Sequence, residues 1–253
     1  MKLSSVSENI NTEKRIAITP DIAKKYIDLE FDLYLSKNYG LHLGFADDEY
    51  KNFGVNFLDS EKEIISNTEV LIQLGLPNDE KLSFLKENQT LIGSLNTFSN
   101  KEKLDKLSSK KINSFSLELL PRITRAQSMD ILSSQANLAG YKAVVEAFQV
   151  YEKAVPMMMT AAGTIPAAKV LVVGAGVAGL QAIATAKRMG AVVFATDVRM
   201  ASREQVESLG GKFLTVEGSE NLETEGGYAK EASDGFKKKQ EELLSETLKK
   251  IDI

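Results

Sequence analysis

The chain has 253 residues, more than a single domain of about 100 to 200 usually holds, so its length predicts two domains, each with its own core. Hydrophobic residues make up 43% and charged residues 26%, which excludes a disordered chain, and the absence of cysteine excludes disulfides and thiolate-bound metals. With 31 basic against 35 acidic residues and a net charge of −4, no nucleic-acid partner is expected.

The first half of the chain alternates short apolar runs with amphipathic stretches, the pattern of a parallel sheet covered by helices. Its first ten residues lack the apolar core of a signal peptide, which fits a cytoplasmic protein. A helix is expected to begin after Thr19, the N-cap, with Pro20 in its first position, and to run toward Leu29. The candidate strands lie at 2–6, 31–35, 70–74, 90–95 and 112–117.

A long helix is predicted over 134–152, because apolar residues recur there at the spacing of one helical face. This helix joins the two halves, so we place the boundary near 133, with one domain over 1–132 and a second over 133–253. The apolar positions are Leu138, Tyr141, Val144, Val145 and Phe148.

The second half predicts strands at 169–173, 191–196 and 212–216 and helices at 177–189 and 203–209, with Gly190 as a helix C-cap. A polar stretch over 217–230, a charged helix over 235–250 and the opening of another strand at 251–253 follow. Residues 156–186 carry a single charge, Lys169, but Pro166 and four glycines interrupt them, so no membrane insertion is expected.

A glycine motif, Gly174-Ala-Gly176-Val-Ala-Gly179, directly follows the first of these strands and opens the helix, and Asp197 ends the next strand. Alone, G-x-G-x-x-G is weak evidence, but in this context it predicts a dinucleotide-binding βαβ unit. Gly174 permits the tight turn, Gly176 admits a pyrophosphate and Gly179 lets the helix press on the strand. We therefore expect an α/β chain with two Rossmann-like parallel-sheet domains joined by a long helix. The second would be incomplete, because such folds have about six strands.

Asp197 is expected to select the nucleotide. A carboxylate there accepts hydrogen bonds from the adenosine ribose, and it repels the 2′-phosphate of NADP(H). The alternative is a turn residue at a strand end. Arg199, two residues on, is a complication, because an arginine can accommodate a 2′-phosphate. We favour NAD(H), since Asp197 occupies the position that the ribose reaches.

The segment PRITRAQSMDILSSQANLAGY, 121–141, closely resembles the NAD(H)-binding domain I of proton-translocating NAD(P) transhydrogenase, the alpha-subunit type. The likeness continues through PMMMTAAGTIPAAKVLVVGAGVAGLQAIATAKRMGAV, ATDVR and EQVESLGGKF to FKKKQ at 236–240. Over 1–120 it is weaker. It rests there on EKRIAITP at 13–20 and GFADDEY at 44–50, which resemble the N-terminal domain shared by transhydrogenases and alanine dehydrogenases.

The resemblance implies that Arg122, Gln127 and Asp130 position the nicotinamide; without it, this spacing is more often a solvated helix start. The amide of Gln127 can donate to and accept from a carboxamide. The resemblance also implies a mobile loop at Gly227 and Tyr228 that closes over the nucleotide. The full set of implied cofactor residues is Arg122, Gln127, Asp130, Ser133, Gly174, Gly176, Val177, Gly179, Asp197, Val198, Arg199, Gly227, Tyr228 and Gln240.

Alanine dehydrogenases need an acid/base pair, and in that family a lysine and a histidine serve. Alignment places Gly75 and Asn96 at those positions, while Arg15 remains at the substrate-arginine position but could equally pair with a carboxylate structurally. The single histidine, His42, lies in a turn-like stretch and is expected to be a surface or capping residue. Hydride transfer between two nicotinamides needs proximity and exclusion of water rather than an acid/base.

The resemblance therefore implies the NAD(H)-binding component of a transhydrogenase, whose hydride goes from NADH to NADP+ on a partner domain. A separate membrane domain would couple the transfer to proton movement, so the chain is expected at the cytoplasmic side, peripheral to the inner membrane, and as a homodimer. It would bind NADH but not turn over alone, and no metal site is expected. The alternatives are an alanine dehydrogenase-like enzyme and a non-catalytic NAD-binding module.

Overall fold

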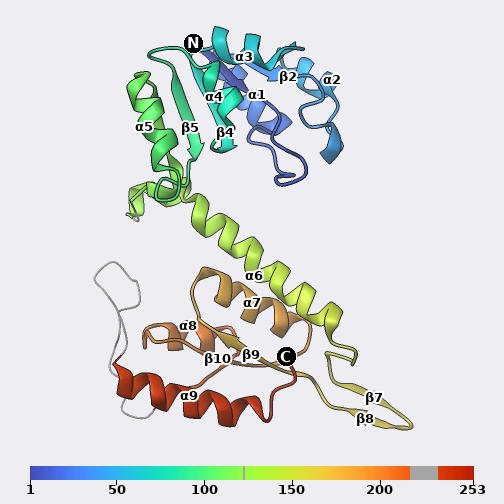
Figure 1. Cartoon of the computed structure of the whole chain (residues 1–253). Helices are drawn as coiled ribbons and strands as arrows, with labels where there is room; N and C mark the ends of the chain where they lie inside the picture. The colour runs from blue at the N-terminus through green and yellow to red at the C-terminus, as the bar shows by residue number, and fades with distance from the viewer. Residues whose placement is uncertain (122, 217–232) are drawn as a thin grey trace. The chain divides into compact units, whose positions relative to one another are not determined.

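The computed structural model describes residues 1–121, 123–216 and 233–253. They divide into two compact units, Met1–Asp130 and Ile131–Ile253. Each unit contains its own parallel sheet with helices packed on it, as Figure 1 shows. The predicted class, α/β with two Rossmann-like parallel-sheet units, is confirmed.

Unit 1 is built on a six-stranded sheet in the order β3-β2-β1-β4-β5-β6, in which every pair is parallel. The strands are β1 (Lys2–Ser5), β2 (Asp32–Ser36), β3 (Asn56–Leu58), β4 (Val70–Gly75), β5 (Thr90–Ser94) and β6 (Asn113–Ser116). The helices are α1 (Pro20–Asp28), α2 (Asp47–Lys51), α3 (Glu61–Asn67), α4 (Asp79–Ser83) and α5 (Lys101–Ser109), with 3₁₀ segments at Leu41–Leu43, Leu117–Leu119 and Thr124–Met129.

Two hydrophobic cores lie on opposite faces of this sheet. Successive strand residues point to opposite faces, so Val70 belongs to one core and Leu71 to the other. Helices α1 and α2 contribute Ala23 and Tyr50 to the first core, whereas α3, α4 and α5 cover the second. The alternating apolar pattern of the first half therefore reflects a sheet buried on both sides.

The side chain of Gln73 joins β1 to β4 beyond the end of their shared ladder. The last paired residues of the two strands are Ser4 and Leu71. Past them, the Gln73 Oε1 accepts from the Val6 backbone N–H at 2.9 Å, and its Nε2 donates to the Val6 carbonyl at 3.1 Å. Gln73 is 3% exposed, and its amide satisfies main-chain groups that no neighbouring strand reaches.

Unit 2 contains a three-stranded parallel sheet in the order β11-β10-β9 and a separate antiparallel hairpin of β7 and β8. Beside β9, the Leu171 N–H donates to the carbonyl of Ile253 at 2.9 Å, so the last residues lie along the sheet, as expected for 251–253. The strands are β7 (Met158–Thr160), β8 (Gly163–Ile165), β9 (Lys169–Val173), β10 (Val192–Thr196) and β11 (Lys212–Phe213); the helices are α6 (Ile131–Val150), α7 (Val177–Arg188), α8 (Ser202–Ser208) and α9 (Asp234–Leu248).

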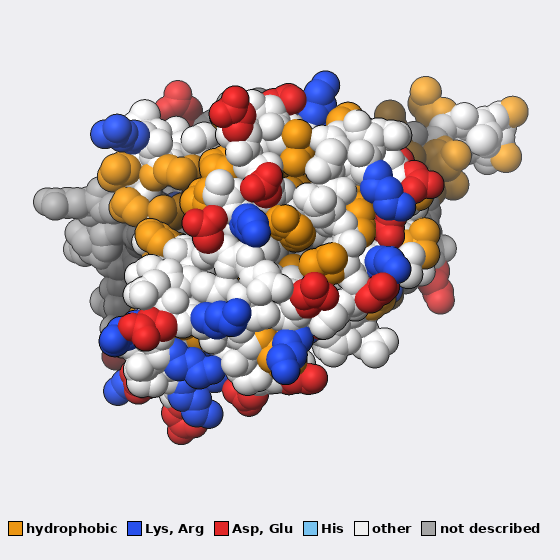
Figure 2. Space-filling view, turned by 90° about the horizontal axis from the view of Figure 1, so that it is seen from above, with side chains coloured by type: hydrophobic (Ala, Val, Ile, Leu, Met, Phe, Trp, Pro, Cys, Tyr) orange, Lys and Arg blue, Asp and Glu red, His pale blue; other side chains and the backbone are white. Residues whose placement is uncertain are grey.

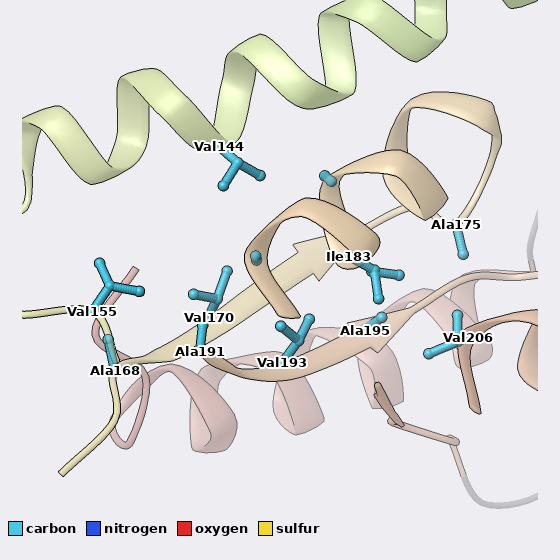
Figure 3. Close-up of a cluster of buried hydrophobic side chains, with 12 residues drawn as sticks. Val144, Val155, Ala168, Val170, Ala175, Ile183, Ala191, Val193, Ala195 and Val206 are labelled. Carbon is cyan, nitrogen blue, oxygen red and sulfur yellow. The ribbon is translucent and has the colours of Figure 1, made fainter. Parts of the chain in front are cut away.

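The core of unit 2 fills the space between its sheet and the helices α6, α7 and α8. Figure 3 shows Val170 and Val193 of the sheet facing Ile183 of α7, with Val144 of α6 above and Val206 of α8 beside them. Helix α9 lies on the opposite face of the β9 and β10 sheet (Figures 1 and 3). The result is three layers, with the strand–turn–helix segment β9–α7 at the centre.

Helix α6 buries a different face from the predicted one. Val144 is buried, but Leu138 and Tyr141 are 58% and 51% exposed. The closest approach to α7 is made at Gly140, beside the backbone of Ala178. Apolar periodicity missed this face because a glycine offers contact through its main chain and adds nothing to the hydrophobic pattern.

Other differences from the expectations are local. Thr19 is the N-cap of α1, but its side chain makes no capping bond. Helix α7 ends with Met189 as its C-cap, and Gly190 follows with a φ of +89°, so the glycine serves the turn one position later. Strand β11 covers two residues of the expected 212–216, and the hairpin of β7 and β8 was not expected.

The described surface is of mixed charge. Figure 2 shows acidic and basic side chains interspersed over one face, with hydrophobic side chains between them. Among the residues described, no helix is both long enough and apolar enough to span a bilayer.

Candidate functional site

The turn between β9 and α7 is shaped by its three glycines. Gly174 has a φ of +96°, a conformation that favours glycine, and its N–H donates to the carbonyl of Thr196 on β10 at 2.8 Å. Gly179, in the first turn of α7, lies so close to the turn that an added Cβ would be 1.8 Å from the carbonyl oxygen of Gly174. The helix therefore begins directly against the end of the strand, with its first amides at the turn.

The outer side of this turn is open. A Cβ built on Gly174 would meet no heavy atom within 4 Å, and one on Gly176 would meet only the Nη2 of Arg199, at 3.9 Å, among the described residues. Val173, which ends β9, is 67% exposed, and Val177, the first residue of α7, is 38% exposed. An anionic group can thus approach the α7 N-terminus, where the helix dipole favours negative charge, and an apolar ring can cover the two valines.

Asp197 follows the end of β10 and faces this turn. Its Oδ2 accepts from the Ala175 N–H at 2.7 Å and from the Arg199 Nη2 at 3.0 Å. Its Oδ1 accepts from the backbone N–H of Arg199 at 2.8 Å and from the Arg199 Nε at 2.9 Å. The side chain of Asp197 is 7% exposed and that of Arg199 is 21% exposed.

These bonds set the charge of the site. Burial opposes ionisation of Asp197, but the hydrogen bonds from the Arg199 side chain, the Arg199 amide and the Ala175 amide hold its pKa below the ordinary value. Asp197 is therefore ionised at neutral pH and paired with Arg199. The sequence alone suggested a carboxylate open to a ribose, whereas in the structure an arginine already engages it.

The remaining predicted residues of unit 2 lie on two helices and one loop. Ser133 is half-buried in the first turn of α6, and Gln240 is half-buried on α9. Val198 is half-buried between Asp197 and Arg199. Gly227 and Tyr228 lie outside the described residues.

Two of the predicted nicotinamide residues belong to unit 1. Gln127 is exposed in the 3₁₀ segment Thr124–Met129, and Asp130 is the C-cap of that segment. The Asp130 N–H donates to the Gln127 carbonyl at 3.2 Å, so the two residues stand at the ends of one turn, three positions apart. Arg122 lies outside the described residues.

Unit 1 also contains a cavity of about 610 Å³, which sequence reasoning did not identify. It lies at the carboxyl ends of β1 and β4, the neighbouring strands from which the chain proceeds in opposite directions across the sheet. Such a switch point is where open α/β sheets bind ligands. The signal available in the sequence was the pair of polar segments, 7–15 and 73–78, that follow two buried strands.

Charged side chains line the cavity. The Glu8 carboxylate accepts from the Leu74 N–H at 2.8 Å, and burial raises its pKa although the Leu74 and Gly75 amides and Lys81 act in the opposite direction. Arg15 pairs with Glu13 at 2.6 Å, the structural pairing that the sequence had left open. The cavity is thus lined by both acids and bases.

The positions that would carry acid/base chemistry hold other residues. Gly75 lines the cavity where a lysine would be needed, and Asn96 is exposed with a φ of +47°. His42 is exposed in the 3₁₀ segment Leu41–Leu43, where its Nε2 lies 2.7 Å from the carbonyl of Lys14, which confirms a surface role. The described residues that line the cavity therefore include no histidine.

Two family models match the chain. Residues 5–139 match "Alanine dehydrogenase/PNT, N-terminal domain", and residues 143–253 match "Alanine dehydrogenase/PNT, C-terminal domain". Together the two matches cover both structural units and most of the sequence.

Known proteins agree with these models. The chain is 46% identical over its full length to the first portion of NAD(P) transhydrogenase subunit alpha from Rhodospirillum rubrum, and it spans 68% of that protein. A transhydrogenase structure from Sinorhizobium meliloti superposes with a TM-score of 0.81 at 44% identity, over 85% of this chain and 64% of that one. An L-alanine dehydrogenase structure, at 21% identity, has a TM-score of 0.73 over 85% of this chain and 60% of that one, which shows a shared fold. The chain therefore belongs to the alanine dehydrogenase/PNT family and, within it, to the transhydrogenase alpha-subunit type, as a component of an oxidoreductase.

Proposed function

We propose that this chain is the NAD(H)-binding component of a transhydrogenase and that it presents NADH to NADP+ held on a partner domain. The observation that carries the proposal is the open glycine turn at the α7 N-terminus with the Asp197 carboxylate beside it. The functional division we propose is an N-terminal domain over 1–132 and an NAD(H)-binding domain over 133–253.

The residues of unit 2 suit a dinucleotide that lacks the 2′-phosphate. The amides at the start of α7 receive the pyrophosphate, and Gly176 leaves room for it. Asp197 receives the ribose hydroxyls, and Val173 and Val177 offer apolar surface to a ring. We further assign Gly174, Gly179, Val198 and Arg199 to the same site.

We assign Arg122, Gln127, Asp130 and Ser133 to holding the nicotinamide, and Gly227, Tyr228 and Gln240 to closing over the nucleotide. The bound dinucleotide supplies a hydride at C4 of its nicotinamide, which passes to C4 of NADP+ and leaves NAD+ and NADPH. The task of the protein residues is to orient the ring and exclude water, because this step moves no separate proton. The lack of a lysine at position 75 and of a histidine at position 96 fits that chemistry.

The partners follow from the same proposal. An NADP(H)-binding domain and a membrane domain would complete the complex and couple hydride transfer to proton translocation, with this chain peripheral to the inner membrane on the cytoplasmic side. A homodimer is the proposed oligomeric state. Its support is the hairpin of β7 and β8, on which Met158, Met159 and Ile165 are 47%, 76% and 49% exposed.

The decisive experiment is reconstitution. The chain is first titrated with NADH by calorimetry, and then mixed with the NADP(H)-binding domain of a transhydrogenase. Transfer is followed with an NAD+ analogue whose reduced form absorbs at a separate wavelength. We expect NADH binding by the chain alone and hydride transfer only in the mixture. Binding without transfer would indicate a non-catalytic NAD-binding module, and absence of NADH binding would overturn the proposal.

A further inference from the structure

The Asp197 carboxylate has no acceptor position to spare. A carboxylate accepts about four hydrogen bonds, two at each oxygen. Asp197 receives four from the protein, one from Ala175 and three from Arg199. A ribose hydroxyl could donate to this carboxylate only if one of those four donors withdrew.

Two of the four donors can withdraw without disturbing the fold. The Ala175 and Arg199 amides are main-chain groups fixed by the turn and by the end of β10. The Nε and Nη2 of Arg199 belong to a side chain with several rotatable bonds, and they grip both oxygens of Asp197 in a fork. A rotation of this side chain alone would therefore free one acceptor position on each oxygen.

The guanidinium also stands beside the open turn. Its Nη2 is the nearest described atom to the place of the missing Cβ of Gly176, at 3.9 Å. The Arg199 side chain is 21% exposed and that of Asp197 is 7% exposed, so the arginine lies on the solvent side of a carboxylate that solvent hardly reaches. A ligand approaching Asp197 along the turn meets Arg199 first.

We propose that Arg199 closes the adenosine-ribose position and is displaced when a dinucleotide binds, so that it sets both affinity and the choice between NAD(H) and NADP(H). The inference rests on the proposed NAD(H) binding. Unphosphorylated ribose competes with the guanidinium for Asp197, because both donate hydrogen bonds to the same oxygens. A 2′-phosphate instead accepts hydrogen bonds, so the displaced guanidinium is its partner and the carboxylate its opponent.

The proposal predicts opposite effects on the two cofactors when the arginine is removed. In Arg199→Met, NADH no longer has a competitor for Asp197 and should bind about tenfold more tightly, a value expected for one or two charge-assisted hydrogen bonds that need not be broken. NADPH loses its cationic partner and faces an unpaired carboxylate, so it should bind about tenfold more weakly. Selectivity for NADH would rise about a hundredfold.

The test is calorimetric titration of the full chain with NADH and with NADPH. Arg203→Met is the matched control, because Arg203 lies four residues away, is 53% exposed and pairs with Glu207 rather than Asp197. It removes the same charge, so general attraction to phosphates changes equally, and we expect less than a twofold effect on either cofactor. Arg199→Lys is a second variant, which keeps the charge but cannot form the fork; it should bind NADH about threefold more tightly.

Circular dichroism of each variant establishes that it is folded, and Arg199→Lys carries the test if Arg199→Met is not. NADH binding that is unchanged or weaker in the folded Arg199 variants, while the wild type and Arg203→Met bind NADH normally, would overturn the gating proposal and leave the proposed function in place. A wild-type chain that binds neither cofactor would overturn both.

Discussion

The main chain of Gly140 on α6 lies directly against the carbonyl oxygen of Ala178 on α7. A Cβ added to Gly140 would be 2.0 Å from that oxygen and 2.8 Å from the carbonyl carbon, distances that no side chain can occupy. Ala178 is itself the second residue of α7, next to the glycine turn. The position of α6 is therefore fixed by a backbone contact at the turn proposed to bind the nucleotide.

Gly140→Ala should destabilise unit 2 by about 3 kcal/mol, the upper end of the cost of overpacking, because main chain rather than a movable side chain meets the new methyl group. Urea unfolding followed by circular dichroism measures the loss. Gly235→Ala, in the first turn of α9 with nothing within 4 Å of its Cβ, is the control and should be neutral or stabilising by up to about 1 kcal/mol. Equal losses in both variants would contradict the role of the contact.

Asp197→Ala should weaken NADH binding by about 1 to 3 kcal/mol, because the ribose hydroxyls lose their acceptor in a site that is largely dry. Calorimetric titration with NADH measures the change. Glu207→Ala removes a carboxylate that is 49% exposed and contacts Arg203, and it should leave the affinity unaltered. An Asp197→Ala chain that binds NADH as the wild type does would refute the assignment of this residue.

The Asp197–Arg199 pair predicts a pH dependence of stability. The folded-state pKa of Asp197 lies below its unfolded value of 3.8, so the stabilisation is complete above about pH 3.8 and is lost as the pH falls through the lower folded-state value. Wild type and Asp197→Asn should therefore differ in urea unfolding at pH 7 and converge as the pH falls below 3.8. A difference that stayed constant down to about pH 3 would show that the charge of Asp197 contributes nothing.

L-Alanine should not support reduction of NAD+ by this chain. Oxidation of an amino acid requires a general acid/base, and the cavity of unit 1 presents Gly75 where that lysine is expected. The assay is NADH absorbance in the presence of alanine and NAD+, with an alanine dehydrogenase as the positive control. Alanine-dependent NADH formation would favour the alanine dehydrogenase alternative.

The strongest sequence signals were those in which one residue type has a single mechanical use. The glycine motif located β9 and the start of α7 correctly, since Gly174 needs a positive φ and Gly179 has no room for a Cβ. The strand at 191–196 was also right to one residue, because its buried apolar run is bounded by Gly190 and Asp197. Short helices such as α2 and α4 were missed, since five residues carry too little periodicity to distinguish them from loops.

The site was harder to predict than the fold because its groups interact. Sequence placed Asp197 at the end of β10 and noted Arg199 beside it, but a list of residues cannot show that the arginine occupies the acceptor positions of the carboxylate. The cavity of unit 1 was missed for a related reason. It arises from strand order, β1 beside β4, which no local pattern encodes.

The hydrogen bonds between Gln73 and Val6 bear on the rigidity of that cavity. Parallel strands that diverge at a switch point leave a seam that water or a ligand could open, yet here one amide bridges it, donating and accepting as a peptide unit would. The same Nε2 lies 3.3 Å from the Glu8 carboxylate. The floor of the cavity is thus preorganised: its shape is inherited from the sheet and does not wait for an occupant to impose it.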